Sequence, residues 1–465
     1  MVQDTAQRSL TFVSHIVIIK NSVADVQPFH GLRYNIERID DLSAVICPPY
    51  DVISPEEQLF YHHSSPYNVI RLEFGEEQPV DSSEDNKYTR AAATMASWLR
   101  EDILTREECP AFYLVEHRFS YQDTVMSRFS LIARVRLVEL SANSQIRPHE
   151  MTMRKPGEDR LNLLKSCHAN LSPIMGLFRH REGGIQSQFP DTIDKPAIHA
   201  ADRYGVSYAM WIVSDKEAIA RVSDFFANKN VYIADGHHRY ETALAYSQEQ
   251  RAIQPSCTGD EAFNFVMITL TAAEDPNLIM MPTHRLVRGL NTERLVRLKA
   301  ELSAYFDEEL LSPYSTASET LKGWTKNLKE QQVTAFGLYG LDGPHLCLLR
   351  AKREMMPVTQ PSLLQDLDVH ILHQLVFRQI FGLDSQEKAE DCLAFTRDGL
   401  DAFSRVDSGD YQLAFLLNPT PISTMLSVAD EGVRMPQKST YFHPKTPSGL
   451  VINPLRDDSS YSAVL

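Results

Sequence analysis

A short apolar run followed by Asp-Gly, two histidines and an arginine constrains this chain more than any other segment. Val231 to Ala234 has the length and composition of a buried strand, and Asp235-Gly236 is a typical turn pair. From Tyr240 to Gln250, apolar side chains recur at helical spacing. The segment therefore predicts a strand, a tight turn and a helix in direct succession.

The expected junction has the properties of an anion-binding site. A helix N-terminus offers unpaired backbone N–H groups and the positive end of the helix dipole. Gly236 lets the backbone approach a ligand closely, the guanidinium of Arg239 matches phosphate oxygens, and a histidine can move a proton near neutral pH. We therefore expect phosphate or nucleotide binding by Asp235, Gly236, His237, His238 and Arg239.

Two other interpretations of this junction stay open. In the first, the segment is a plain turn in which Asp235 caps the helix and His237 and His238 are solvated. In the second, the histidines bind a metal ion, but adjacent histidines diverge on a helical turn and no cysteine or H-x-x-x-H partner is near. The sequence favours metal ligation least, and it identifies no metal ligands.

Length and pattern predict a mixed α/β (α+β) fold. A chain of 465 residues exceeds one ordinary hydrophobic core, so two or three domains are expected. Some predicted strands are sequential and others are separated by helices, which favours this class over a doubly wound sheet. The main expected strands are 13–19, 111–115, 126–138, 173–178, 207–213, 263–270, 334–339, 345–350 and 411–417, with His117 and Tyr121 in a connection. The main expected helices are 89–100, 161–169, 216–226, 295–305, 316–328 and 366–381.

Charge and cysteine content exclude several classes of protein. A formal net charge of −15 disfavours nucleic acid and anionic lipid as partners, although it allows a local positive pocket. The six cysteines show no C-x-x-C spacing, which argues against a zinc site or a disulfide scaffold and fits a reducing compartment. Neither a signal peptide nor an apolar run of about 18 residues is visible, so a cytoplasmic protein without a membrane span is expected.

Two further segments carry candidate catalytic groups. Glu150, beside His149 in a polar loop, is the first candidate for the base that takes a proton from a hydroxyl, unless it pairs with Arg147 or Arg154. Asp51 follows a stiff Pro-Pro pair and could hold Mg²⁺ or a substrate amine, or cap the helix that starts near residue 54.

Other residues are candidates for binding the substrate. Arg160 could reach a phosphate, whereas Asp159 is expected to cap a helix. His284 and Arg285 could line the same pocket or form a surface ion pair. The Lys438-Ser439-Thr440 run lies in an irregular segment and suits phosphate binding.

Several of these motifs carry a resemblance to known proteins. The D-G-H-H-R-Y box between strand and helix resembles the signature of the ParB/sulfiredoxin-like superfamily, whose G-x-x-R core grips a nucleotide phosphate. His237 and His238 stand where sulfiredoxins carry their cysteine, so sulfinic-acid repair is not expected. Over nearly the whole chain, ordered blocks resemble the bacterial and archaeal family known as domain of unknown function 1015 (DUF1015). These blocks are residues 47–54, 147–152 with 159–160 and 169–174, 282–285 and 435–445.

The resemblance implies a domain organisation. It predicts a ParB/sulfiredoxin-like core with an additional antiparallel sheet and a C-terminal α/β lobe. The expected divisions are an N-terminal α/β region over 1–200, the core over 201–290, the C-terminal lobe over 291–430, and a loop over 431–465 that returns to the site.

The resemblance also implies a function. Related free-serine kinases, and the frequent position of family members beside serine-biosynthesis genes, suggest a nucleotide-dependent phosphotransferase that interconverts serine and phosphoserine. ADP or ATP and Mg²⁺ are the implied cofactors, the reaction could run as a kinase, a phosphoserine-to-ADP transferase or a phosphatase, and a homodimer is allowed. The alternative is a non-catalytic nucleotide-binding switch, as in the partition proteins. The implied catalytic residues are Asp51, His149, Glu150 and His238, and the implied substrate ligands are Thr152, Arg160, His284, Arg285, Lys438, Ser439 and Thr440.

Overall fold

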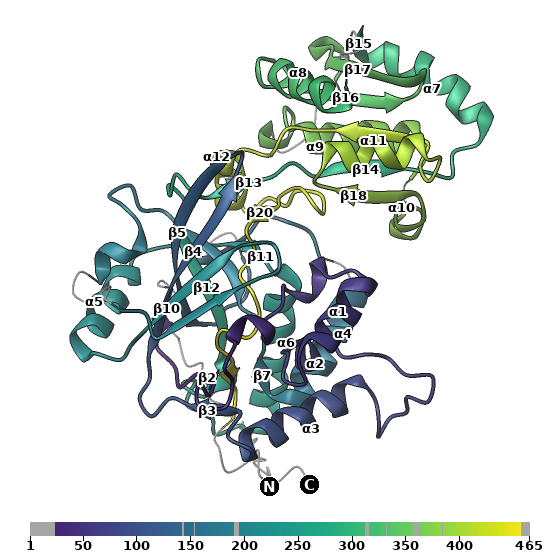
Figure 1. Ribbon diagram of the computed structural model, residues 1–465. Coiled ribbons are helices and arrows are strands. Elements are labelled where there is room, and N and C mark those ends of the chain that lie inside the picture. The colour runs from purple at the N-terminus through teal and green to yellow at the C-terminus, as the bar shows by residue number, and fades with distance from the viewer. Residues whose placement is uncertain are drawn as a thin grey trace, which may run out of the picture.

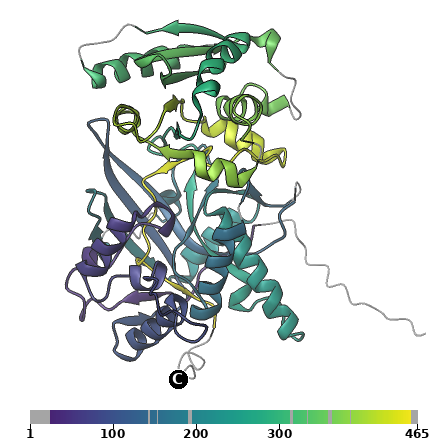
Figure 2. The same cartoon turned by 90° about the vertical axis from the view of Figure 1, so that its right-hand side faces the viewer.

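The computed structural model describes residues 24–456 except 142–143, 153, 190–194, 312–315, 332, 357–361 and 384. The strand predicted over 13–19 lies outside the described residues. The chain forms a large lobe built on one mixed sheet and a C-terminal α/β lobe above it (Figures 1 and 2). The predicted mixed α/β class is confirmed.

The large lobe is organised by a nine-stranded sheet. β11 lies between β6, to which it is parallel, and β8, to which it is antiparallel, so the predicted strand before the Asp-Gly turn is near one edge. The order is β6 (Ile146–Pro148), β11 (Val231–Asp235), β8 (Ile174–Phe178), β12 (Phe265–Ala272), β5 (Thr124–Arg136), β4 (Phe112–Tyr121), β10 (Ser207–Val213) and β9 (Ile198–Ala201), with β1 (Val26–Gln27) paired to β5. Strands from the expected N-terminal region (1–200) and from the expected core (201–290) thus belong to one sheet.

The long hairpin of β4 and β5 corrects one prediction. His117 and Tyr121 lie within β4 and not in a connection. The turn consists of Gln122 and Asp123, both with positive φ, which matches the twist of antiparallel strands in a two-residue hairpin. Because His117 is fully buried, its polar character concealed a strand position.

Helices pack beside this sheet in the large lobe (Figure 1). α4 begins at Arg154, several residues before the predicted start, so Asp159 lies inside the helix and is not its cap. Asp159 instead accepts a hydrogen bond from Tyr88 at 2.8 Å and pairs with Lys87 at 2.8 Å. The helices are α1 (Pro55–Ser64), α2 (Ile70–Glu73), α3 (Lys87–Arg100), α4 (Arg154–Cys167), α5 (Lys216–Phe226) and α6 (His237–Ile253).

The C-terminal lobe has its own six-stranded sheet. The order is β15 (Phe306–Leu310), β17 (Gly343–Ala351), β16 (Ala335–Gly340), β19 (Leu413–Leu416), β14 (His284–Val287) and β18 (Leu393–Thr396). Its helices are α7 (Thr292–Tyr305), α8 (Ala317–Lys329), α9 (Asp368–Ile371), α10 (Gln386–Cys392), α11 (Gly399–Asp407) and α12 (Ile422–Asp430). The single helix predicted over 366–381 is instead α9 followed by a π-helix over Leu372–Ile380. Phe381 caps the C-terminus of the π-helix and donates its N–H to the carbonyl of Val376.

The C-terminal segment returns through the whole large lobe. After α12 it pairs as β20 (Phe442–His443) with β13 (Ile279–Met280), and as β21 (Asn453–Pro454) with β7 (Ala169–Asn170). A third short pair joins β2 (Leu32–Tyr34) and β3 (Leu104–Arg106), and the backbone of Leu32 also bonds to Ile452. In Figure 1 this yellow segment runs from the junction of the lobes toward the bottom of the molecule. It thereby connects the lobes to the region of the predicted site.

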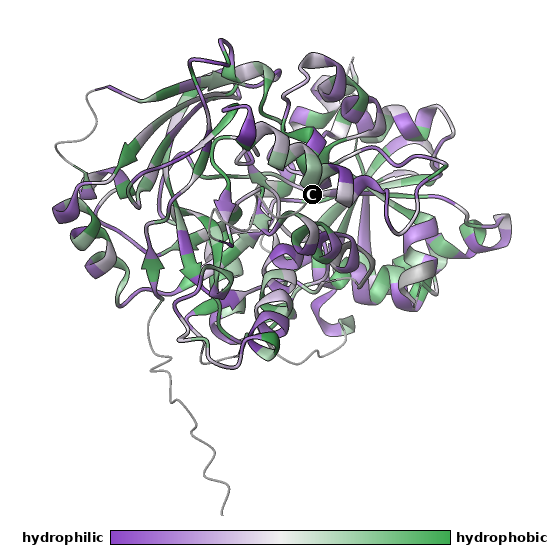
Figure 3. Cartoon of the chain, turned by 90° about the horizontal axis from the view of Figure 1, so that it is seen from below, coloured by the Kyte–Doolittle hydropathy of each residue, from purple (hydrophilic) through white to green (hydrophobic). Residues whose placement is uncertain are grey.

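Hydrophobic packing accounts for these layers. Viewed from below, apolar residues colour much of the strands, while surface helices alternate between apolar and polar residues (Figure 3). One core lies mainly in the C-terminal lobe and includes Phe336 and Phe415, and another covers the large sheet and includes Phe178 and Phe226. In the described part of the chain, no helix has the length and apolar character needed to cross a bilayer.

Candidate functional site

The predicted strand, turn and helix are present, with Gly236 as the N-cap of α6. Gly236 has φ +90°, and a Cβ there would lie 2.9 Å from Nε of Arg239, so a side chain would be strained and would displace Arg239. No side chain caps this helix, which leaves its first N–H groups available. The alternative with an Asp235 cap and solvated histidines is therefore wrong, since His237 is also buried.

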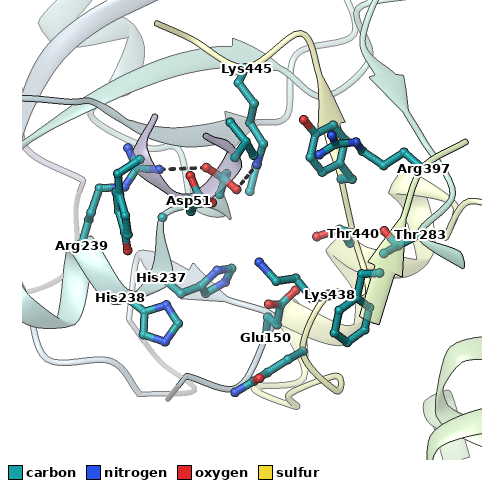
Figure 4. A pocket seen from close by; sticks show the side chains of 18 of the residues that line it. Asp51, Glu150, His237, His238, Arg239, Thr283, Arg397, Lys438, Thr440 and Lys445 are labelled. Atoms are coloured by element: carbon teal, nitrogen blue, oxygen red, sulfur yellow. Dashed lines mark hydrogen bonds and ion pairs between the residues drawn. The ribbon is translucent and has the colours of Figure 1, made fainter. Parts of the chain in front are cut away.

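The segment from β11 to α6 borders a cavity of about 490 Å³ (Figure 4). The cavity lies between the two lobes. One wall comes from the large lobe, and another comes from the end of β18 and the start of α11. The C-terminal segment supplies the third wall. The lining residues are Tyr50, Asp51, Val52, Glu150, Ala234, Asp235, Gly236, His237, His238, Arg239, Thr283, Phe395, Thr396, Arg397, Asp401, Gln437, Lys438, Thr440, Tyr441 and Lys445.

A largely buried ion triad forms one side of the cavity. The carboxylate of Asp235 accepts from Arg239 at 2.8 Å and also pairs with Lys445, as the dashed lines in Figure 4 indicate. Arg239 further donates to the carbonyl of Pro173 at 2.6 Å and to the hydroxyl of Ser172. Although burial opposes ionisation, Lys445 and then Arg239 hold the pKa of Asp235 well below its usual value. Arg239 is thus committed to holding the junction together, a role that its sequence position did not reveal.

Glu150 lines the cavity, and the pKa of its carboxyl is raised. Burial raises the pKa of its carboxyl to about 7, although Lys438 and the backbone N–H of Lys438 favour the charged form. The alternative pairing with Arg147 is not observed, because Arg147 pairs with Asp430. Glu150 is therefore a carboxyl group that can gain or lose a proton near neutral pH.

His149 lies behind the cavity and is linked to it through Thr440. Its Nδ1 is 2.8 Å from the carbonyl oxygen of Ile233, and its Nε2 is 2.9 Å from Oγ1 of Thr440. Its backbone N–H donates to Nε2 of His237 at 3.3 Å. Burial lowers the pKa of His149 to about 4, so the ring is neutral at pH 7. The predicted catalytic histidine therefore does not line the cavity itself, and it contacts two residues that do, Thr440 and His237.

Two cations in the cavity form no ion pair within the described part of the chain. Lys438 stands in the left-handed region at φ +57°, which turns its backbone N–H toward Glu150. Arg397 places its guanidinium carbon 4.3 Å from the ring centroid of Tyr441. His238 lies on the opposite side of the cavity in Figure 4, and burial lowers its pKa. Lys438 and Arg397 are the cations best placed to receive an anionic ligand.

Asp51 lines the cavity from the turn Tyr50–Val52 and does not cap α1. That cap is Ser54, which forms a reciprocal capping box with Glu57. Within the described residues, no group of three or more His, Cys, Asp or Glu side chains could hold a metal ion. A Mg²⁺ ion that arrives with phosphate needs only one or two protein carboxylates, and Asp51 fits that requirement.

The remaining predicted ligands do not line this cavity, and Arg160, His284 and Arg285 are engaged elsewhere. Arg160 is buried, donates to the carbonyl of Glu73 and to Asp159, and stacks on Tyr50 at 3.9 Å. His284 accepts the N–H of Leu417 and borders a neighbouring cavity of about 550 Å³. Arg285 donates to the carbonyls of Thr283 and Lys438.

Ser439 is buried and donates to the carbonyl of Pro436, and Thr152 is half-buried and does not line the cavity. Sequence reasoning missed Thr283, Arg397, Tyr441 and Lys445 as lining residues. Thr283, Tyr441 and Lys445 lie within the blocks that resemble the DUF1015 family, and this was the only indication that they belong to the site. Arg397 had no signal at all.

Comparison with known structures gives only distant likenesses. A conserved hypothetical protein from Pyrococcus furiosus is 13% identical with a TM-score of 0.34, and the match covers 69% of this chain and 93% of that one. A free serine kinase in complex with AMP is 11% identical with a TM-score of 0.33, covering 67% of this chain and 86% of that one. SbnI with a C-terminal truncation from Staphylococcus aureus is 11% identical with a TM-score of 0.33, covering 71% and 92%. Similarities of this size carry no argument about activity.

Comparison by sequence gives the clearer result. A search of the curated proteins found no significant match. The family model described as "Protein of unknown function (DUF1015)" matches residues 26–370, which is well over half of the chain. This protein therefore belongs to the DUF1015 family.

Proposed function

We propose that the protein is a nucleotide-dependent phosphotransferase that interconverts serine and phosphoserine. One observation carries the proposal: a single cavity combines a carboxyl with a pKa of about 7, an uncapped helix N-terminus and two cations that form no ion pair among the described residues. Phosphoryl transfer depends mostly on positioning and on electrostatic stabilisation, and these groups supply both.

In this proposal the phosphates of ADP or ATP lie at the N-terminus of α6, near Lys438. Backbone N–H groups and a nearby lysine are the usual partners of phosphate oxygens. Arg239 acts through Asp235 to hold the junction in place, because its guanidinium is already bound. Asp51 would hold Mg²⁺, which would supply charge neutralisation at the phosphates.

Glu150 handles the hydroxyl proton. In the kinase direction its carboxylate takes the proton while the serine oxygen forms a bond to phosphorus. The leaving nucleotide keeps the electron pair of the broken P–O bond. In the reverse direction protonated Glu150 returns the proton to the serine oxygen. Kinship with the ParB/sulfiredoxin-like superfamily, a cytoplasmic location and a homodimer remain parts of this proposal.

Two parallel incubations test the proposal. The full chain is mixed with Mg²⁺, phosphoserine and ADP, or with Mg²⁺, serine and ATP, and products are followed by ³¹P NMR. We expect serine and ATP in the first mixture, or phosphoserine and ADP in the second. Free phosphate in place of these transfer products would indicate hydrolysis, and nucleotide binding without turnover would indicate the switch protein. Either outcome contradicts the transferase.

A further inference from the structure

One corner of the cavity contains a buried hydroxyl without a partner. Thr283 is 8% exposed, it lines the cavity, and its Oγ1 has no hydrogen-bond partner among the described residues. A buried polar atom without a partner destabilises the fold, so such atoms are rare and call for an explanation. A ligand in the cavity would supply the missing partner.

The fold places two other polar side chains beside Thr283. In the pairing of β14 with β18, His284 lies opposite Thr396, so Thr283 and Arg397 occupy the next positions along the two chains. Met281 donates its N–H to Tyr441, and Arg285 joins the carbonyls of Thr283 and Lys438. Thr440 is therefore brought to the same corner, and Figure 4 shows all three side chains on one side of the cavity.

The hydrogen-bond polarity of Thr440 follows from its neighbours. The carbonyl of Ile233 can only accept, so Nδ1 of the neutral His149 ring carries the proton. Nε2 of His149 therefore accepts, and the Thr440 hydroxyl donates to it. With its single proton used, the oxygen of Thr440 offers only lone pairs to the cavity. It is suited to an ammonium or another donor.

Arg397 offers the complementary charge. Its stacking on Tyr441 orients the guanidinium plane, and no carboxylate pairs with it within the described ranges. A stacked guanidinium presents a planar edge of N–H donors that matches a carboxylate. Asp401, which also lines the cavity, pairs with Arg405 at 3.8 Å and forms no ion pair with Arg397.

We propose that Thr283, Arg397 and Thr440 form a subsite for the α-amino acid end of the substrate. Arg397 and Thr283 bind the carboxylate, and Thr440 accepts a hydrogen bond from the ammonium. This inference rests on the proposed function and deepens it, because it restricts the phosphoryl acceptor to a free amino acid. The substrate hydroxyl is then directed toward Glu150, on the other side of Lys438.

Calorimetric titrations in the absence of nucleotide test the subsite separately from catalysis. O-phosphoserine and O-phosphoethanolamine differ in the carboxylate, so the wild type is expected to prefer O-phosphoserine about tenfold or more. Thr283→Val and Arg397→Met are expected to lower this preference toward one, whereas Thr283→Ser retains it. If the variants weaken both probes equally, the corner binds the phosphoryl group and the proposal is overturned.

Thr269 provides a matched control. Its hydroxyl is also buried and unpaired among the described residues, but it lies in β12 and lines none of the cavities described above. Thr269→Val is expected to leave both affinities unchanged, and neither valine variant is expected to lower the unfolding midpoint. A wild type that binds both probes equally, or neither of them, overturns the subsite. If the subsite stands and no transfer is detected, the phosphotransferase alone is rejected.

Discussion

Substitution of Glu150 by glutamine is expected to lower kcat for phosphoryl transfer about 10²- to 10⁴-fold, because the amide cannot take the hydroxyl proton. In the wild type the kinase reaction should rise with pH and level off above about 7, where the carboxyl has ionised. The reverse reaction needs the protonated acid and should fall over the same range. Initial rates from about pH 5.5 to 8.5 measure both profiles, and a flat wild-type profile contradicts the assignment.

The same substitution should stabilise the fold at alkaline pH. The folded pKa of Glu150, about 7, exceeds its ordinary value of 4.5, so the native state favours the protonated acid. This contribution is complete below about pH 4.5 and is lost as the pH rises to 7. By linkage it amounts to about 3 kcal/mol, which Glu150→Gln should recover at pH 8 and not at pH 4.

Asp368 provides the control for this prediction. Burial raises its pKa to about 7 as well, but it lies in the C-terminal lobe outside the cavity. Asp368→Asn should therefore shift the unfolding free energy at pH 8 in the same direction and leave kcat unchanged. Equal losses of kcat in both variants would mean that removing any buried acid lowers the rate, and that Glu150 is not the base.

Replacement of Asp235 by alanine is expected to lower the free energy of unfolding by about 3–5 kcal/mol. The substitution leaves Lys445 and Arg239 buried without their shared counter-charge. In a double-mutant cycle of Asp235→Asn with Lys445→Met, the coupling should exceed about 1 kcal/mol, because the two side chains are in direct contact. Urea unfolding at pH 7 measures each corner of the cycle.

A surface pair serves as the comparison for this cycle. Lys299 and Asp342 are 2.7 Å apart, and more than half of each side chain is exposed, so solvent screening should leave their coupling much weaker than that of the Asp235 pair. Because the pKa of Asp235 is depressed, its stabilisation is present above about pH 3.8 and is lost as the pH falls through the folded value. Equal coupling in the two pairs would show that the triad is not a distinct stabilising unit.

Local patterns predicted those elements whose burial follows a simple period. The strand 207–213 and the helix 216–226 have the predicted bounds, since alternating or helical apolar positions face one core. The start of α4 was missed, because Arg154 to Asp159 is polar throughout and its helical state depends on packing and on partners such as Lys87. His117 misled the prediction for a related reason, since a buried histidine looks like a loop residue when its neighbours are unknown.

The candidate site was predicted in part. Asp51, Glu150, Lys438, Thr440 and residues 235–239 all line one cavity, although nearly 400 positions separate the first from the last along the chain. Arg160 and Arg285 were expected there because arginine suits phosphate, yet both are buried on backbone carbonyls. The sequence shows which side chains carry a charge, but it does not show which groups those side chains contact.

By itself, the sequence determined the mixed α/β class, the strand–glycine–helix junction and the family, because these depend on local periodicity, on the φ that only glycine adopts readily, and on ordered motifs. Only the tertiary structure decided which charges are neutralised. Asp235 binds Arg239 and Lys445, while Lys438 and Arg397 form no ion pair in the described ranges. The reason is that pairing, burial and pKa depend on distances between segments far apart in the chain, and these distances exist only once the lobes and the C-terminal segment have packed together.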